Sequence, residues 1–468
     1  MTKINFDDLG GPNPDGPKTK KTKKEKRAVF LIEPYNFETR SGRFWFLNRE
    51  GSWLELPPRE FCRYLAATFG FSLKRTDGAP SACERIVTEI QNTRVVNAVA
   101  SIAGHFGPKI IRHGGMTILV KDAPQLIEPK EGEYPTIILL LSGMLTSEQY
   151  SHVIWWLHQA VDDLYNHRLT LGTAQVLCGP HSAGKSLWQR LQGLILGGRS
   201  ARPYQFMSGQ TIFNAHIVGA EYLLIEDEHS ATDLKSRLAL GNAIKAFVAN
   251  EEKQVHAKYQ TPFMPPPVFQ RLSVSLNDES ENVALLPPGD VSLDHKVNYY
   301  DVSRVPMPMP TSTSAEKELF WATLVGELPA FIWDLLHNTH IPTEWLDHRF
   351  GLKAFRAQRV LELLEEHQPE AKLLELIDIL YFEGQCDFIP MASGTGSSAK
   401  SGNASEIAAD LRHKDSPVKS LADDLLRGPS MIGKLLQRLV KKHPDRVSFK
   451  RSEFSKTYTI FPPKEATS

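Results

Sequence analysis

The stretch Gly179-Pro-His-Ser-Ala-Gly-Lys-Ser186 decides the fold of this chain of 468 residues. Its two glycines let the backbone turn tightly, so that successive N–H groups can point into one concave space. Lys185 adds a point charge for the β- and γ-phosphates of a nucleotide, and Ser186 offers a hydroxyl to a magnesium ion. The sequence therefore predicts a nucleotide-binding loop made of Gly179, Pro180, His181, Ser182, Ala183, Gly184, Lys185 and Ser186.

The segments on either side of this loop are those that phosphate binding requires. Thr173-Ala-Gln-Val-Leu-Cys178 is a short apolar run that predicts a strand. Leu187-Trp-Gln-Arg-Leu-Gln-Gly-Leu-Ile-Leu196 predicts a helix whose N-terminus faces the phosphates. The alternative, a glycine turn beside a surface lysine, accounts for neither flank.

An acidic strand is the second element of the predicted site. Tyr222-Leu-Leu-Ile225 is an apolar run that ends in three carboxylates, Glu226, Asp227 and Glu228. Open α/β sheets bind their ligands at the carboxyl ends of such strands. We assign Asp227 to the metal ion and Glu228 to the attacking water, with Glu226 and Asp227 as the alternative pair. A strand end with solvated charges is the competing interpretation.

Two further segments complete the predicted core. Arg271-Leu-Ser-Val-Ser-Leu-Asn277 is a strand that ends in one amide, which in a phosphate-loop ATPase can reach the γ-phosphate and the attacking water. Before it, a helix leads into a short hairpin whose cations and aromatic ring suit the phosphates and bases of a DNA strand. An exposed charged turn is the alternative for this hairpin, whose candidate DNA contacts are Lys253, His256, Lys258 and Tyr259.

The chain ahead of this core is predicted to have two parts. Residues 1–27 form a Lys-rich polar tail that is expected to be disordered and either touches DNA without specificity or only solubilises the chain. Residues 28–145 mix alternating and helical segments, which fits an α+β domain, and they carry no catalytic signature. The core itself is placed at residues 146–385, with a helical stretch over residues 314–366.

A small tail domain is expected at the end of the chain. A Ser/Gly-rich linker at residues 386–403 precedes three helical patterns and two alternating strands in residues 404–468, the order of a winged helix-turn-helix. Cations on its third helix share a face that would touch DNA phosphates: Lys434, Arg438 and Lys441. A solvated helix or a protein-docking surface would explain the same pattern.

Composition and charge limit the partners and the compartment. With 41% apolar residues, 23% charged residues and a formal net charge of zero, any nucleic-acid surface must be local. The four cysteines form no CxxC pair, which fits a reducing cytoplasm and argues against a zinc ribbon. We expect no membrane span, because the longest apolar run noted, residues 137–141, is far shorter than a bilayer requires.

The order of phosphate loop, acidic strand, basic hairpin and Asn-ending strand resembles the superfamily 3 helicases of viruses, phages and plasmids. It is most similar to the helicase part of phage primase-helicase (primase-polymerase-like) proteins, over roughly residues 145–365. The resemblance implies a P-loop AAA+ ATPase fold that works as a ring, usually a hexamer, with hairpins that pull one DNA strand through the pore. It also implies that Lys185 and Ser186 bind phosphate and magnesium, that Asp227 and Glu228 catalyse, that Asn277 senses the γ-phosphate and that Lys258 contacts DNA.

The sequence departs from this family in one respect. Many members carry an arginine shortly after the sensor asparagine, which reaches the ATP of the neighbouring subunit. No arginine lies between Asn277 and Ser303 here, so Lys296 and Arg304 are the candidates for that role. A finger supplied in trans changes hydrolysis by orders of magnitude in other NTPases.

These features predict an ATP- and Mg²⁺-dependent DNA helicase that acts in replication of a phage or mobile element, in the bacterial cytoplasm and with a possible primase partner. The alternative is an AAA+ protein that binds an origin or loads another helicase without unwinding DNA itself. A small-molecule kinase fits less well, because the basic hairpin and the long flanking domains would have no role in it.

Overall fold

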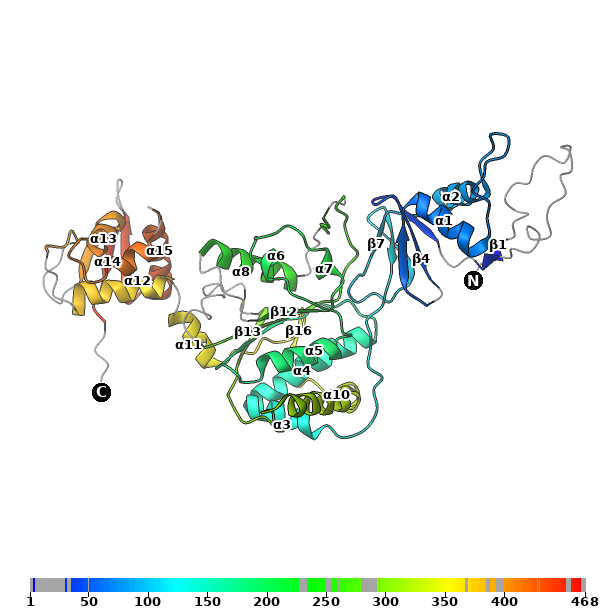
Figure 1. Cartoon of the computed structure of the whole chain (residues 1–468). Helices are drawn as coiled ribbons and strands as arrows, with labels where there is room; N and C mark the ends of the chain where they lie inside the picture. Colours follow the sequence, from blue (N-terminus) through cyan, green and yellow to red (C-terminus); the bar gives the residue numbers. More distant parts are fainter. Residues whose placement is uncertain are drawn as a thin grey trace.

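The computed structural model describes residues 3–4, 30–31, 35–48, 50–226, 234–249, 254–258, 261–278, 293, 295–366, 369–383, 388–392, 399–426, 428, 430–451 and 456–463. A parallel sheet with helices on both faces lies at the centre, between N-terminal sheets on one side and C-terminal helices on the other (Figure 1). The predicted mixed α/β architecture is confirmed.

The central sheet has five strands in the order β11-β12-β13-β10-β14, and all neighbouring strands run parallel. Every residue of β10 and β13 is buried, which is why neither strand shows the alternation of a half-exposed sheet. The strands are β10 (Ala174–Cys178), β11 (Ser200–Ala201), β12 (Tyr222–Glu226), β13 (Arg271–Leu276) and β14 (Val297–Asp301).

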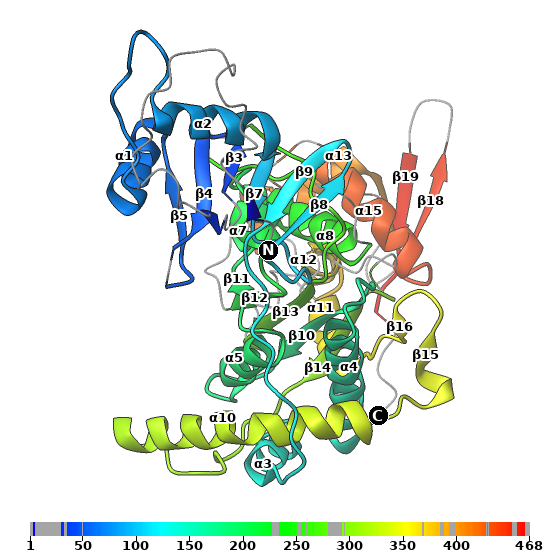
Figure 2. The ribbon, with the colours of Figure 1, turned by 90° about the vertical axis from the view of Figure 1, so that its right-hand side faces the viewer.

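Helices cover both faces of this sheet. α5 packs against β12 and β13, and a long helix, α10, then packs on α3, α4 and α5, so that α10 lies across the bottom of the core in Figure 2. The helices α6 to α8 lie on the other face (Figure 1). The bounds are α3 (Pro135–Met144), α4 (Ser147–Tyr165), α5 (Lys185–Ile195), α6 (Tyr204–Met207), α7 (Ala215–Val218), α8 (Leu234–Val248) and α10 (Ser314–His337).

α10 bears on the expectation that the chain has no membrane span, which stays a prediction. Among the described residues it is the one helix that is long and apolar enough to cross a bilayer by length and composition. Its buried side chains, among them Leu324, Leu328 and Phe331, belong to the main hydrophobic core. Core helices of folded proteins pass the same test, and α10 packs on α3, α4 and α5.

The predicted helical stretch over residues 314–366 is interrupted. After α10 the chain forms a short turn and a two-stranded ribbon, and it becomes helical again only at α11. Asp347 accepts hydrogen bonds from the backbone N–H groups of Arg349 and Phe350, and Gly351 has a φ of +77°, so this segment is a turn rather than a helix. The elements are η3 (Thr343–Trp345), β15 (Leu346–Asp347), β16 (Gly351–Leu352) and α11 (Gln358–Glu366).

The N-terminal region contains two main sheets. Two helices, α1 and α2, pack with a four-stranded sheet, β5-β4-β3-β6, and a three-stranded sheet, β7-β9-β8, follows with its own hydrophobic cluster. The predicted domain boundary at residue 145 does not coincide with the packing, because Leu140, Leu141 and Met144 of α3 belong to the central core. The elements are β1 (Lys3–Ile4), β2 (Phe30–Leu31), β3 (Asn36–Glu38), β4 (Arg43–Leu47), β5 (Trp53–Leu56), α1 (Pro58–Phe69), α2 (Ala82–Thr93), β6 (Val95–Val96), β7 (Ala98–Ala100), β8 (Lys109–His113) and β9 (Met116–Val120).

The C-terminal unit begins earlier in the chain than the predicted linker. Leu373 and Ile377 of α12 share one hydrophobic core with Leu435 and Leu436 of α15, so α12 packs with the tail. The end of the predicted linker forms β17, which pairs with β19. The elements are α12 (Pro369–Asp378), the π-helical turn η4 (Ile379–Glu383), β17 (Lys400–Asn403), α13 (Ala404–Leu411), α14 (Lys419–Leu425), α15 (Met431–Lys442), β18 (Val447–Arg451) and β19 (Lys456–Ile460).

Candidate nucleotide-binding site

The predicted phosphate loop connects the carboxyl end of β10 to the N-terminus of α5. At Gly179 a Cβ atom would lie 2.0 Å from the carbonyl oxygen of Val302, so only glycine fits there. Gly184 has a φ of +87°, a left-handed conformation that glycine adopts without strain, and it caps α5. The two glycines are therefore required by a close backbone approach and by the turn into the helix.

The ammonium group of Lys185 ties this loop together. Its Nζ donates hydrogen bonds to the carbonyl oxygens of Gly179 (2.6 Å) and Pro180 (2.8 Å) and to Oδ1 of Asn277 (3.0 Å). Lys185 is only 7% exposed, and these three contacts hold its ammonium group against the loop and the end of β13. A phosphate that enters the loop must therefore exchange with some of these contacts.

Asn277 brings a second strand to the loop. It follows β13 directly, it is 3% exposed, and its side-chain amide also contacts Nε2 of His181 at 2.9 Å. Ninety-two residues separate Asn277 from Lys185 in the chain. The structure thus brings together two residues that the sequence predicted separately, and their contact makes the loop and the end of β13 one continuous edge.

The acidic strand lies beyond β13, so β13 separates it from β10. Glu226 is the last residue of β12, pairs in register with Ser275 and forms an ion pair with Arg202, which follows the edge strand β11. Asp227 and Glu228 lie outside the described residues. Sequence reasoning missed Arg202, because no local pattern connects it to a strand that begins twenty residues later.

A cavity of about 510 Å³ opens in front of the phosphate loop. This volume lies within the range of small-molecule sites. Ser186 is exposed to the cavity on the first turn of α5, where its hydroxyl can meet a magnesium ion. Among the described residues no group of three His, Cys, Asp or Glu side chains is arranged to hold a metal ion. Beyond the loop, the cavity is lined by Leu187, Arg190, Ser275, Asn277, Met307, Thr311, Lys317, Phe320 and Trp321.

An arginine that the sequence analysis did not select bridges two strand ends beside the loop. Arg359 of α11 donates to Asp301, the last residue of β14, at 2.7 Å and to Asp278, next to Asn277, at 2.8 Å. Between these strand ends, burial raises the pKa of the Cys178 thiol to about 12, so this cysteine stays a neutral packing residue. The contacts of Arg359 connect the start of the C-terminal helices to the edge that holds the loop.

The predicted DNA hairpin is described at its stem. Val255 and Phe263 form an antiparallel bridge. The backbone N–H of His256 donates a hydrogen bond to Oδ1 of Asn214 (2.7 Å), and the backbone N–H of Asn214 donates one to the carbonyl oxygen of His256 (3.1 Å). Lys258 is exposed and His256 is half-buried. Lys253 and Tyr259 lie outside the described residues.

The stem rests on the N-terminal region. Val255 and Phe263 share a hydrophobic cluster with Ile118 and Val120 of β9. The guanidinium of Arg40 lies 4.7 Å from the centre of the Phe263 ring, and its Nε donates to the carbonyl oxygen of Thr261 at 2.6 Å. Sequence periodicity could not predict this packing, because the stem and its partners in the N-terminal region are more than 130 residues apart.

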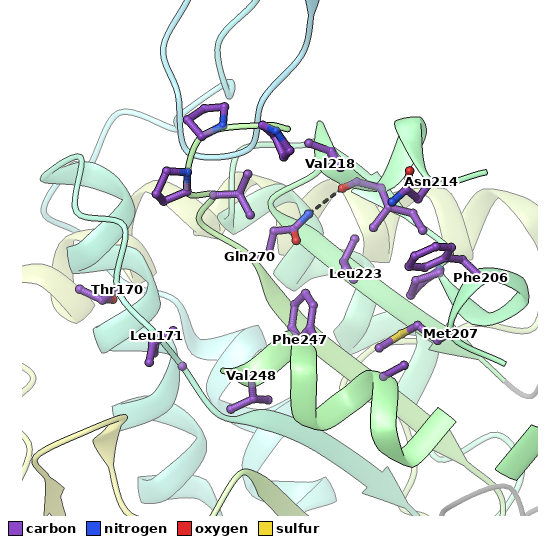
Figure 3. Close-up of a pocket in the computed structure, with 18 residues that line it drawn as sticks. Thr170, Leu171, Phe206, Met207, Asn214, Val218, Leu223, Phe247, Val248 and Gln270 are labelled. Atoms are coloured by element: carbon purple, nitrogen blue, oxygen red, sulfur yellow. Dashed lines mark hydrogen bonds between the residues drawn. The ribbon is translucent and has the colours of Figure 1, made fainter. Parts of the chain in front are cut away.

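An apolar cavity of about 150 Å³ lies near the same hairpin (Figure 3). Its walls come from α6, α7, α8 and the proline run before β13. Gln270 donates to the carbonyl oxygens of Ile217 (2.6 Å) and Ala220 (2.9 Å), so its amide is occupied at the cavity wall. The cavity therefore lies next to both chain segments that lead into and out of the hairpin.

The two candidates for a residue that acts on a neighbouring subunit lie at opposite edges of the sheet. Lys296 precedes β14, and its carbonyl oxygen accepts from Ala174 at the start of β10, so it is at the edge away from the phosphate loop. Arg304 follows β14, is exposed, and is at the same edge as the loop. Lys296 and Arg304 therefore lie far from each other within one chain, and the role of each at a neighbouring subunit stays a prediction.

On the C-terminal unit, two of the three predicted cations point outward. Lys434 and Lys441 are exposed on α15. Arg438 instead lies 3.5 Å from the carboxylate of Glu370 on α12, which also accepts from Lys442 at 2.9 Å. Glu370 is 2% exposed, so Arg438 contributes at least in part to the packing of α15 on α12.

No protein-family model matches this chain, and no curated protein matches it. Among solved structures, the apo C-terminal region of NrS-1 is similar over 92% of this chain and 96% of its own, with a TM-score of 0.52 and 11% identity. A second form of the same region matches over the same shares, with a TM-score of 0.51 and 9% identity. The SCCmec type IV Cch active helicase matches over 89% of this chain and 79% of its own, at 8% identity and a TM-score of 0.29, which is too low to bear on the fold. The chain therefore shares its fold with the NrS-1 C-terminal region.

Proposed function

We propose that this chain is an ATP-dependent DNA helicase or translocase with an AAA+ core of the superfamily 3 type. The observation that carries the proposal is the contact between Lys185 and Asn277, because it joins a phosphate loop to a polar strand end at one edge of a parallel sheet. The strand order supports it, since β13 lies between the loop strand and the acidic strand. Asn277 is then within reach of both the γ-phosphate and the water that attacks it.

The roles of the residues follow from this edge. Backbone N–H groups of the loop, Lys185 and Ser186 would hold the β- and γ-phosphates and the magnesium ion, which supplies charge neutralisation during phosphoryl transfer. Asp227 would hold the metal through water and Glu228 would orient the attacking water. The ion pair of Glu226 with Arg202 supports this register over the alternative pair, because it occupies the Glu226 carboxylate.

DNA would be engaged by the hairpin after α8 and by the C-terminal unit. Lys258 is exposed at the hairpin, and Lys434 and Lys441 are exposed on α15, where three helices and an antiparallel ribbon suit a winged helix. We propose a homo-oligomeric ring, with six subunits as the expected number, in which Lys296 or Arg304 reaches the neighbouring site. The setting would be the cytoplasm of a bacterial cell that carries a phage or mobile element, with a primase as a possible partner.

A second candidate is a non-unwinding initiator or helicase loader. The observation that favours it is the separate hydrophobic core of the C-terminal unit, which suits an independent DNA-recognition module. Such a protein would bind and hydrolyse ATP but would not separate strands alone. Deleting the unit would then abolish sequence preference.

The test is the rate of ATP hydrolysis by the full chain with and without single-stranded DNA, with Lys185→Ala as the blank. We expect strong stimulation by DNA, followed by strand separation in an unwinding assay. Hydrolysis that ignores DNA, together with no unwinding, would favour the initiator or loader. A Lys185→Ala protein as active as the wild type would refute the site itself.

A further inference from the structure

The cavity in front of the phosphate loop has a wall that the loop motif does not include. On this wall the guanidinium of Arg190, from α5, lies 3.9 Å from the centre of the Trp321 ring of α10. A cation this close to an indole face forms a favourable stack. The pair joins two helices that are 131 positions apart in the chain, counted from residue 190 to residue 321.

The position of this pair relative to the phosphates follows from helix geometry. Arg190 is four residues after Ser186 on the same helix, so it shares a face with the magnesium-binding hydroxyl about one turn, or ~5.4 Å, further along. Phe320, which is 3% exposed, fixes the adjacent part of α10 in the core. Phe320 thus holds the part of α10 that carries Trp321 in a fixed position. Arg190 lies one helical turn beyond Ser186, so the wall adjoins the predicted phosphate site.

The chemistry of the wall differs from that of the loop. The loop presents backbone N–H groups and an ammonium, which suit phosphate oxygens. Arg190 and Trp321 both line the cavity, with the guanidinium over the indole ring. A guanidinium plane and an aromatic ring are groups on which a nucleic-acid base stacks without a requirement for particular edge groups. The cavity of about 510 Å³ extends over both surfaces.

Resting on the function proposed above, we infer that the base of the bound nucleotide stacks on the layer formed by Arg190 and Trp321. The ligand of this part of the cavity is therefore an aromatic base, and the layer contributes affinity for the nucleoside half of the nucleotide only. Because stacking uses the face of the base, purine and pyrimidine nucleotides should both bind, with an advantage for the larger purine ring.

The experiment separates the two halves of the nucleotide. Calorimetric titrations of the full chain with ADP and with inorganic pyrophosphate, both with Mg²⁺, report the base and the phosphates separately. In Trp321→Ala we expect ADP to bind about tenfold more weakly, since base–aromatic stacks are worth this much or more, while pyrophosphate binding is unchanged. Unchanged pyrophosphate binding also shows that the variant has folded. Trp321→Phe keeps a flat ring and should retain most of the ADP affinity.

Trp333→Leu is the matched control, because Trp333 lies on the same helix but not at the cavity and stacks on His337 instead. It should bind both ligands as the wild type does. Equal ADP binding by Trp321→Ala and wild type, or an equal loss for ADP and pyrophosphate, would overturn the stacking inference while leaving the phosphate site intact. A wild-type protein that binds neither ligand would overturn the proposed function and, with it, the inference.

Discussion

The phosphate loop and the hairpin after α8 are held in place in different ways. The loop is shaped by its own glycines and by its neighbours in one strand–loop–helix unit, with Asn277 as a single distant partner. The hairpin stem depends on distant segments: Asn214, the β7-β9-β8 sheet and Arg40, which is 221 residues away from Thr261.

This difference has a functional consequence. Substitutions in the N-terminal region should reach the predicted DNA contacts through the hairpin stem and leave the phosphate edge unchanged. Residues 28–145, which carry no catalytic signature, would then act as the support of the hairpin. The two regions should therefore respond independently to substitution.

The largest effect is expected from two deletions at the C-terminal boundary. Removing residues 404–468 leaves the apolar side of α12 without its partners, including Leu373, Leu376 and Ile377. Each of these side chains loses about 1.5–3 kcal/mol of burial free energy, so the truncated chain should aggregate through the exposed apolar surface. Removing residues 367–468 takes out the whole unit, and the phosphate edge should survive.

Size-exclusion chromatography and ATP hydrolysis distinguish the two deletions. The shorter chain, ending at residue 366, should be soluble and active, and the longer one, ending at residue 403, should aggregate. Equal behaviour of both chains would show that α12 belongs with the central core.

The next effect is expected at the contact that joins the loop to β13. Asn277→Ala should lower kcat for ATP hydrolysis by about 10²-fold, the loss seen when one polar group that stabilises a transition state is removed. Nucleotide binding should change little, because Lys185 keeps its two carbonyl partners. Asn338→Ala, at the exposed end of α10, is the control. A loss confined to binding would contradict the proposed role.

Acid should destabilise the central core through His152. Burial lowers the pKa of His152 from 6.5 to about 4, while Nδ1 contacts the Tyr300 hydroxyl and Nε2 contacts the carbonyl oxygen of Lys353, both at 2.8 Å. Because the unfolded chain takes up the proton more readily, stability is complete above pH 6.5 and falls as the pH drops toward 4. The loss is about 3 kcal/mol in total.

Urea unfolding at several pH values between 7 and 4 measures this loss. The part of the pH dependence that comes from His152 should be absent in His152→Gln, which carries no titratable group. If the variant shows the same slope as the wild type in this range, the buried histidine is not the cause.

The smallest effect is expected at the hairpin stem. Phe263→Ala removes a ring that is 3% exposed and packs with β9 and Arg40, so the stem should loosen. We expect stimulation of hydrolysis by single-stranded DNA to fall several-fold, with the rate in the absence of DNA unchanged. Lys258→Ala should give the same pattern by removing the contact itself.

Phe69→Ala is the control for this substitution, because Phe69 is 41% exposed at the end of α1. It should leave DNA stimulation intact. If Phe263→Ala lowers the basal rate as much as the stimulated rate, the stem and the phosphate edge are coupled, and the contrast between the two regions does not hold.

Much of the central fold could be predicted from local pattern. The strand before the loop, the helix after it and the three helices and two strands of the tail are all near the predicted positions. The helical stretch over residues 314–366 was predicted too long, because apolar spacing continues through a segment that Asp347 and Gly351 turn into a ribbon. The unit that contains α12 was divided at the wrong place, because composition marks a Ser/Gly segment and not the packing of Leu373 on α15.

The candidate site divides in the same way. The loop residues and Asn277 were predicted from the chain alone, and their contact supports the placement. Arg202, Arg359, Arg190 and Trp321 were missed, because each meets its partner through a different element of the fold. The nearest sequence signal was a charged or aromatic residue on a helix or after a strand, which is too common to single out.

By itself the sequence determined that a glycine-rich loop, predicted to bind phosphate, lies between a strand and a helix, since glycine conformation and a helix N-terminus are properties of neighbouring residues. Only the tertiary structure decided which strand end meets Lys185, which surface supports the hairpin and which aromatic ring faces the cavity. Those contacts join residues about 90 to 220 positions apart, and such pairs are selected by the packing of whole elements, which no local periodicity records.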